Sequence, residues 1–167
     1  MVGILMGSKS DLEVVRNAFD VLDSFGVPFT ARILSAHRTP AEAAEFADNA
    51  EKNGIKVIIC AAGMAAHLGG VVAGHTTLPV IGIPMVSEPF KAADSLLSVV
   101  QMPPGIPVAA VTCGKAGAKN AALYAVSILA TADAELAAKL KDFRARQREQ
   151  VLSADAELQE ELAARGK

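Results

Sequence analysis

Five short apolar runs recur between residues 2 and 113, and segments with the periodicity of helices separate them. The run at residues 57–61, Val-Ile-Ile-Cys-Ala, is apolar without interruption, which is typical of a parallel strand covered on both faces. Strands that alternate with helices favour a parallel sheet with right-handed crossovers. We therefore expect a three-layer α/β/α sandwich of the flavodoxin-like or Rossmann-like kind, whose five parallel strands lie at residues 2–6, 29–34, 57–61, 79–84 and 107–113.

Glycine, proline and capping residues indicate where the intervening helices begin and end. Gly26 is expected to end the first helix, and the dipeptide Asn53-Gly54 to end the second. Thr39 is the expected N-cap of that second helix, with Pro40 in its first position, where a missing N–H costs nothing. Apolar residues three and four apart predict the first helix at Leu12, Val15, Phe19 and Leu22, and further helices are expected at residues 67–73, 93–100 and 116–130.

A tail follows the predicted sheet, so we divide the chain into an α/β catalytic domain at residues 1–132 and a helical extension at residues 133–167. Asp133 can cap a helix in this tail, and Ser153 can start another turn. The segment 116–130 is apolar nearly all round and has no polar face. Neighbouring subunits would cover such surfaces, and a tail folded back on its own domain is the alternative. The tail's apolar positions are Leu136, Leu140, Phe143, Val151, Leu158 and Leu162.

Composition excludes several classes of protein. The formal net charge is −2, and no cluster of Lys and Arg interleaves with aromatic residues, so a nucleic-acid partner is not expected. No apolar run reaches the ~18 residues of a membrane helix, and the N-terminus enters an apolar run without the pattern of a signal peptide. Cys60 and Cys113 are expected to be small buried hydrophobic residues in strands rather than a disulfide or metal ligands. These features favour a cytoplasmic protein.

The segment 35–40, Ser-Ala-His-Arg-Thr-Pro, places a histidine beside an arginine where a strand should give way to a helix. Ligands of open α/β sheets bind beyond the carboxyl ends of the strands. His37 can act there as both acid and base, and the planar fork of Arg38 suits phosphate or carboxylate. The alternative is a loop histidine satisfied by backbone groups beside a surface arginine.

Two other loops are expected at the same edge of the sheet. Residues 7–11, Gly-Ser-Lys-Ser-Asp, can hold an anion with N–H groups and hydroxyls at a helix N-terminus, although for this loop taken alone helix capping by Ser8 or Ser10 is the better explanation. Residues 62–67 end on His67 among small residues that permit close approach of a ligand, or His67 is a structural histidine. His75 is expected in a plain loop, and Lys115 and Lys119 on the surface.

Taken together, these segments resemble the N5-carboxyaminoimidazole ribonucleotide mutase family of purine biosynthesis, also known as the catalytic subunit of phosphoribosylaminoimidazole carboxylase. The resemblance runs from Val2 to about Leu152. It implies an α/β/α sandwich, a homo-octamer with sites at subunit contacts, and no metal or organic cofactor. The motifs that carry it are residues 6–11, 35–40, 65–68 (Ala-Ala-His-Leu), 101–107 (Gln-Met-Pro-Pro-Gly-Ile-Pro) and 115–122 (Lys-Ala-Gly-Ala-Lys-Asn-Ala-Ala).

The resemblance also implies a reaction and a set of roles. The family moves a carboxylate from the exocyclic nitrogen of the aminoimidazole ribonucleotide to ring carbon C4, through CO2 released into a closed pocket. His37 would be the general acid and base, Asp11 would bind the ribose hydroxyls, and Arg38 would bind the phosphate. The remaining substrate-binding residues implied by the resemblance are Ser8, Ser10, Ser35, Ala36, Ala62, Gly63 and His67.

Arg38 and the Ala-Ala-His sequence resemble the mutase class rather than the animal-type enzymes that fix CO2 directly, which carry Lys after the loop histidine. A direct CO2-dependent carboxylase remains the nearest alternative. The chain departs from the family pattern at Ala61 and Met64, often glycine, and at Gly69, often proline, which affects the expected shape of the pocket. A non-catalytic nucleotide-binding module is the competing class, and a flavin carrier is disfavoured because the loops lack aromatic residues to stack on the ring.

Overall fold

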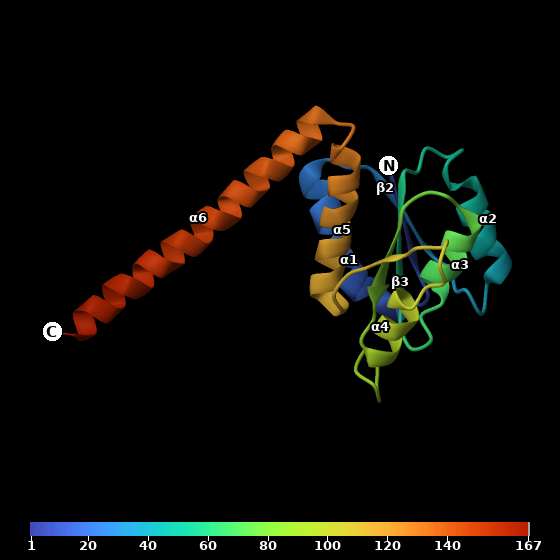
Figure 1. Ribbon diagram of the computed structural model, residues 1–167, viewed down its shortest axis with the longest axis horizontal. Helices are drawn as coiled ribbons and strands as arrows, with labels where there is room; N and C mark the ends of the chain where they lie inside the picture. Colours follow the sequence, from blue (N-terminus) through green and yellow to red (C-terminus); the bar gives the residue numbers. More distant parts are fainter. Residues whose placement is uncertain (167) are drawn as a thin grey trace. The chain divides into compact units, whose positions relative to one another are not determined.

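One sheet of five parallel strands is the centre of the computed structural model, which describes residues 1–166 (Figure 1). The chain divides into two compact units: Met1–Leu129, which contains the sheet, and a second unit that begins at Ala130. The predicted sheet is confirmed. Its strands are β1 (Val2–Met6), β2 (Phe29–Ile33), β3 (Val57–Ala62), β4 (Val80–Pro84) and β5 (Ala109–Ala110), in the spatial order β2-β1-β3-β4-β5.

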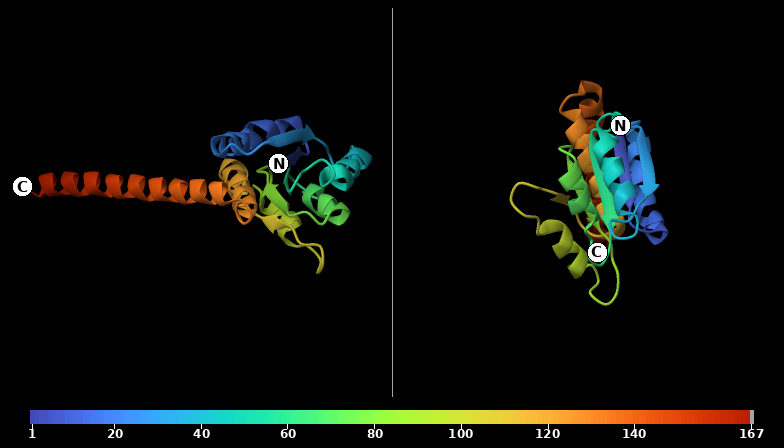
Figure 2. Two further views of the ribbon diagram at one scale, coloured as in Figure 1. Left: turned by 90° about the horizontal axis from the view of Figure 1, so that it is seen from above. Right: turned by 90° about the vertical axis from the view of Figure 1, so that its right-hand side faces the viewer.

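Helices cover both faces of this sheet, which confirms the three-layer sandwich (Figures 1 and 2). Helices α1 (Leu12–Phe25) and α5 (Gly114–Ala130) lie on one face. The short 3-10 helix η1 (Lys9–Asp11) precedes α1. The other face carries α2 (Pro40–Ala50) and α3 (Leu68–His75), and α4 (Ala93–Val100) packs against β4 and β5. The second unit is the long helix α6 (Ala134–Arg165).

The core is aliphatic and rich in alanine. Every residue of β1 is buried, as a strand paired on both edges and covered on both faces requires. In α2 the buried residues Ala43, Ala47 and Ala50 stand at spacings of four and three, so small side chains form the inner face of that helix. These alanines pack in one cluster with Leu5 and Ile58 of the sheet, and the small side chains let helix and sheet approach closely.

The strand limits differ from the sequence prediction at the sheet edges. β5 comprises only Ala109–Ala110 because it pairs with β4 at just two positions, opposite Ile81 and Gly82. The prediction of a strand over residues 107–113 was therefore too long. Leu34, predicted as the last residue of β2, lies just beyond it, although its N–H still donates to the Met6 carbonyl at 2.9 Å.

The helix limits agree in part. Gly26 ends α1 with φ 71°, as predicted, and α4 has the expected bounds. The regular part of α2 ends at Ala50, but the Asn53 N–H still makes a helical bond to the Asn49 carbonyl at 3.0 Å. Gly54, at φ 77°, then ends the last turn, in which the Ile55 N–H donates to the Ala50 carbonyl, so the predicted stop at Asn53-Gly54 is confirmed.

Helix α6 and the apolar face of α1 agree with the sequence only in part. The prediction that Asp133 caps α6 is confirmed: its side chain accepts from the Leu136 N–H at 2.9 Å. The restart at Ser153 was wrong, since α6 runs unbroken through it and contains no proline or glycine. In α1 the residue Phe19 is only half-buried and stacks on Phe29 of β2, with ring centroids 4.9 Å apart.

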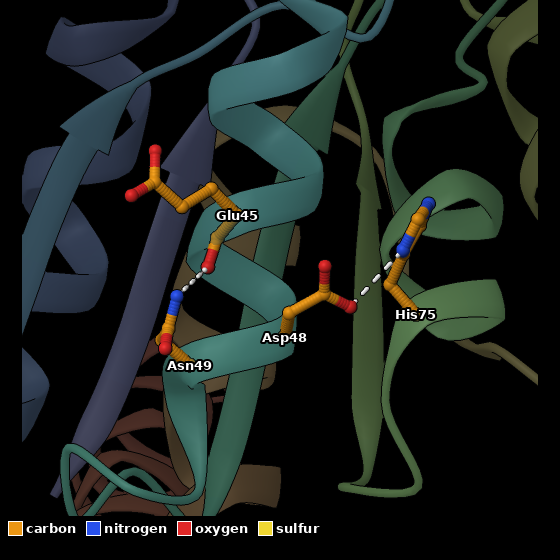
Figure 3. A network of polar contacts seen from close by, with 4 residues as sticks. All are labelled: Glu45, Asp48, Asn49 and His75. Carbon is orange, nitrogen blue, oxygen red and sulfur yellow. Dashed lines mark hydrogen bonds and ion pairs between the residues drawn. The ribbon is translucent and has the colours of Figure 1, made fainter.

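His75 was predicted to lie in a loop, but it is the last residue of α3. Its Nδ1 lies 3.2 Å from Oδ1 of Asp48 in α2, and this contact ties the C-terminal turn of α3 to the neighbouring helix (Figure 3). On the same helix Asn49 donates from Nδ2 to the Glu45 carbonyl at 2.9 Å. The side chains of the pair are both exposed, so the pair adds little to stability.

The two cysteines are free thiols in different surroundings. Cys60 is buried in β3, and that burial raises the pKa of its thiol far above the usual range. Cys113 is half-buried and follows β5 rather than lying in it, so its predicted strand position was wrong. Among residues 1–166, no helix is both long and apolar enough to cross a membrane.

Close packing at two glycines gives a direct test of this fold. A methyl group at Gly117 in α5 would stand 1.7 Å from the Thr112 carbonyl oxygen, whereas one at Gly74 in α3 would meet nothing within 4 Å. We expect Gly117→Ala to lower the free energy of unfolding by about 3 kcal/mol or more, since the backbone must move. Gly74→Ala should raise it by about 0.5–1 kcal/mol through helix propensity. Urea denaturation of the two variants measures both, and equal stabilities would contradict the packing at Gly117.

Candidate active site

The carboxyl ends of four strands meet at one edge of the sheet. The register places Met6 of β1 opposite Ile33 of β2 and Ala61 of β3, and Ala62 of β3 opposite Pro84 of β4. The loops that follow these strand ends surround a cavity of about 550 Å³. Its lining consists of Gly7, Ser8, Ser10, Asp11, Ser35, Ala36, His37, Arg38, Ala62, Gly63, Met64, Ala65, Leu68, Met85, Val86 and Ser87.

The loop after β1 begins the site. The N–H of Gly7 donates to the Ala61 carbonyl at 3.1 Å, which extends the pairing of β1 and β3 by one residue. Ser8 is the N-cap of η1 and accepts from the N–H of Ser10 at 3.3 Å and from its hydroxyl at 2.9 Å. The capping interpretation of this loop is therefore correct as geometry, and the same capped turn presents both hydroxyl groups at the cavity wall.

Asp11 closes this loop at the end of η1, where it is half-buried. Burial raises the pKa of its carboxyl, while the Ser10 hydroxyl, the Ser8 backbone and the Arg38 guanidinium act in the opposite direction. A raised carboxyl pKa means that the folded state favours the protonated form. The contribution of the protonated Asp11 to folding stability is therefore present at low pH and is lost as pH rises through the pKa of the folded state. At higher pH the folded protein holds an ionised, half-buried carboxylate, and hydrogen bonds from a ligand can offset the cost in free energy.

The turn at residues 35–39 is held by its own side chains. Thr39 is the N-cap residue of α2 and Pro40 is the first residue of the helix, as predicted, but the Thr39 side chain makes no capping bond. Its Oγ1 instead accepts from the Ser35 N–H at 2.7 Å and donates to the Ser35 carbonyl at 3.1 Å. The Ser35 hydroxyl in turn accepts from the backbone N–H groups of His37 and Arg38, at 3.4 and 3.2 Å. These bonds close a turn that fixes the backbone at His37 and Arg38.

Arg38 joins the loops that follow β1 and β2. Its Nη2 donates to the Gly7 carbonyl at 2.6 Å, and its Nε donates to the Ser35 hydroxyl at 3.4 Å. Since a guanidinium has five N–H donors in a planar fork, these two bonds orient the group and leave other donors for an anion. Arg38 thereby contacts Ser35 and the residue before Ser8, and Ser8, Ser10 and Ser35 all line the same cavity, so the loops after β1 and β2 supply its polar hydrogen-bonding groups.

His37 and His67 form a pair. Nε2 of His37 lies 2.9 Å from Nδ1 of His67, and the rings meet edge to face with centroids 5.0 Å apart. His67 is the N-cap residue of α3, so the pair links the loop after β2 to the loop after β3. His37 lines the cavity but His67 does not, and the other predicted site residues all do. Sequence reasoning found both histidines and missed their contact.

Sequence reasoning also missed part of the lining. Met85, Val86 and Ser87 follow β4, and the rule that ligands bind beyond strand ends applies to them as it does to the other loops. Met64 has φ 54°, a conformation that favours glycine, which gives a physical reason why glycine is common in the family there. The described part of the chain contains no group of three or more His, Cys, Asp or Glu side chains that could hold a metal ion.

Comparisons with known proteins agree on one family. Curated proteins named N5-carboxyaminoimidazole ribonucleotide mutase are similar over most of their length: that of Bacillus subtilis is 51% identical over 158 residues, covering 95% of this chain and 98% of that protein. That of Saccharolobus solfataricus is 53% identical over 152 residues, covering 91% and 95%.

The fold has the same relatives. The crystal structure of Treponema denticola PurE superposes with a TM-score of 0.86 at 32% sequence identity, and the match covers 94% of this chain and 97% of that one. A sequence profile of the family described as AIR carboxylase matches residues 1–150. Because this family profile covers most of the chain and the named relatives are 51% and 53% identical to it, the chain belongs to the AIR carboxylase family.

Proposed function

We propose that this protein converts N5-carboxyaminoimidazole ribonucleotide to 4-carboxy-5-aminoimidazole ribonucleotide in purine biosynthesis, moving the carboxylate from the exocyclic nitrogen to ring carbon C4. Relatives with this activity in their names are 51% and 53% identical to the chain. The observation in the structure that supports it best is the placement of His37 and Arg38 on one cavity. A proton-transfer group and an anion-binding group are what a carboxylate transfer on a phosphorylated nucleoside needs.

The polar end of the cavity would bind the ribose phosphate. The remaining donors of Arg38 and the hydroxyls of Ser8, Ser10 and Ser35 suit a phosphate, and the turn before α1 adds backbone N–H groups. Asp11 lines the same cavity and interacts electrostatically with Arg38, and it would accept hydrogen bonds from the ribose hydroxyls. Such bonds to an ionised carboxylate offset the cost of its burial, which the raised pKa of Asp11 reflects.

His37 would carry the proton in both half-reactions. It protonates the carbamate nitrogen as CO2 leaves, and it removes the proton from C4 after CO2 has bonded there, since imidazole works in both directions near neutral pH. In the contact with His67 one ring nitrogen must donate and the other accept. We assign His67 the role of a positioning residue that fixes which nitrogen of His37 holds its proton.

The small residues beyond β3 would keep CO2 in place. Ala62, half-buried Gly63 and Leu68 border the cavity with little bulk and few polar groups. A small apolar intermediate is retained when the walls are close and water is excluded. Ala36, between Ser35 and His37 in the loop after β2, adds a further small apolar group to the lining.

Direct carboxylation of aminoimidazole ribonucleotide by CO2 is the second candidate, because the family profile is described as AIR carboxylase. Arg38, where the animal-type enzymes carry Lys, and the names of the relatives favour the mutase reaction. The substrate separates the two. A mutase converts the N-carboxylated ribonucleotide without ATP or added bicarbonate, whereas a carboxylase needs CO2 and acts on the uncarboxylated ribonucleotide.

The test of the proposed function compares three histidine variants. With N5-carboxyaminoimidazole ribonucleotide alone, we expect turnover by the unaltered protein and a loss of about 10²–10⁴-fold in His37→Asn, which cannot titrate. His67→Asn should lose less and shift the pH dependence of turnover. His75→Asn, which breaks only the pair with Asp48, should be unchanged.

Substrate binding is measured separately in each histidine variant and should persist. Near-normal turnover in His37→Asn with a strong loss in His67→Asn would reverse the two roles. No turnover by the unaltered protein would refute the mutase reaction.

The anion site is tested at Arg38. Arg38→Lys keeps the charge but loses the planar fork, so we expect substrate binding to weaken by about 1–3 kcal/mol. Arg32→Lys, on an exposed position of β2, is the matched control and should bind normally. Calorimetric titration measures both, with inorganic phosphate as a competitor. Unchanged binding in Arg38→Ala would move the phosphate site elsewhere, with Lys119 and Lys115, which already pairs with Glu13 at 3.0 Å, as the next candidates.

We also propose that the protein works in the cytoplasm as a homo-octamer, as the family resemblance implies. Several large apolar side chains of the α/β unit are exposed, among them Phe90, Leu97 and Val100, with Val151, Leu158 and Leu162 on one face of α6. Surfaces of this kind are typical of subunit contacts. Sedimentation at micromolar concentration should show one species of about eight chain masses, and a stable monomer would contradict the assembly.

A further inference from the structure

Ser87 lies at the wall of the cavity on a segment that is fixed at both ends. The Met85 N–H donates to the Ala62 carbonyl at 2.9 Å, and the fully buried Ser95 donates from its hydroxyl to the Met85 carbonyl at 2.9 Å. The Ser87 carbonyl accepts from the Lys91 N–H at 2.8 Å. Three backbone groups of this segment are therefore engaged, and these bonds tie Ser87 and its neighbours to β3, to α4 and to the turn before α4.

The hydroxyl of Ser87, in contrast, is buried and without a hydrogen-bond partner among residues 1–166. An unpaired buried hydroxyl costs free energy that an alanine would avoid. Ser87 lines the cavity, and rotation about its single χ1 angle carries Oγ among three staggered positions. A hydroxyl kept in such a place is suited to a partner that arrives with the ligand.

The position of Ser87 across the sheet indicates which part of a ligand it meets. Neighbouring strands are about 4.8 Å apart, so β4 lies two strands from β1 and three from β2. A ribonucleotide whose phosphate is bound near Arg38, after β2, would extend its base across the strand ends toward β3 and β4. A methyl group built on Gly63 would stand 3.3 Å from Met85 Cβ and 3.8 Å from Ser87 Oγ, so the hydroxyl lies close to the glycine loop beside the reacting end.

Ser87 follows two apolar residues of the lining, Met85 and Val86, and Met64 lines the same cavity. A single O–H group beside these apolar residues offers a ligand a hydrogen-bond donor. A carboxylate is the strongest acceptor that a carboxylated base offers, and O–H bonds to a carboxylate are stronger than bonds between neutral groups. We propose that Ser87 donates a hydrogen bond to the carboxylate on the base, and so distinguishes the carboxylated from the uncarboxylated ribonucleotide.

This inference rests on the proposed function, and its test compares two ligands. Calorimetry with 4-carboxy-5-aminoimidazole ribonucleotide should show binding weakened by about tenfold or more in Ser87→Ala. Binding of 5-aminoimidazole ribonucleotide, which lacks the carboxylate, should change less than about twofold, because no charge-assisted bond is lost. Ser87→Thr keeps the hydroxyl and should retain the preference. Ser98→Ala is the matched control, since Ser98 is half-buried, bonds the Asp94 carbonyl and does not line the cavity.

The outcomes separate the two proposals. Loss confined to the carboxylated ligand supports the role of Ser87. An equal loss of affinity for both ligands in Ser87→Ala, or no loss for either, overturns that role. The proposed function still stands in that case if the unaltered protein turns over its substrate. An unaltered protein that binds neither ribonucleotide overturns both proposals.

Discussion

The in-register parallel pairing of β1 with β2 and β3 is the constraint on which the rest of the structure depends. It sets Met6 opposite both Ile33 and Ala61, and two hydrogen bonds beyond the strands, from Gly7 to Ala61 and from Leu34 to Met6, continue the pairing into the loops. A slip of one residue would turn every buried side chain of β1 to the other face. The burial of the whole strand therefore fixes where the loops of the site begin.

The loops themselves are stabilised before any ligand is present. Thr39 closes the turn on Ser35, Ser35 holds the N–H groups of His37 and Arg38, and Arg38 reaches across to the Gly7 carbonyl. Groups ordered in advance lose less entropy when a ligand binds. This set of bonds also explains why Thr39, at the N-cap position of α2, makes no side-chain capping bond: its hydroxyl is engaged with the Ser35 backbone.

Small residues set how closely the layers and the loops approach. Gly117 touches the Thr112 carbonyl, and a methyl group on Gly82 would overlap Val99 of α4. Gly63 leaves room between the loops after β3 and β4, where a small intermediate would be held. Met64 keeps φ 54° beside it, so this chain retains the backbone shape of a glycine position while adding a large, exposed side chain at the cavity rim.

The sequence by itself determined the elements whose cause is local. The uninterrupted apolar run of β3, the amphipathic period of α1, Gly26 at its end and Asp133 before α6 were all predicted, because each depends on neighbours within a few residues. The strand-end loops were predicted too, since parallel strands share their direction. Only the tertiary structure decided the length of β5, which pairs with β4 only opposite Ile81 and Gly82. It also decided the contact between His37 and His67, 30 residues apart, and the unpaired hydroxyl of Ser87, because those depend on which side chains the register brings together.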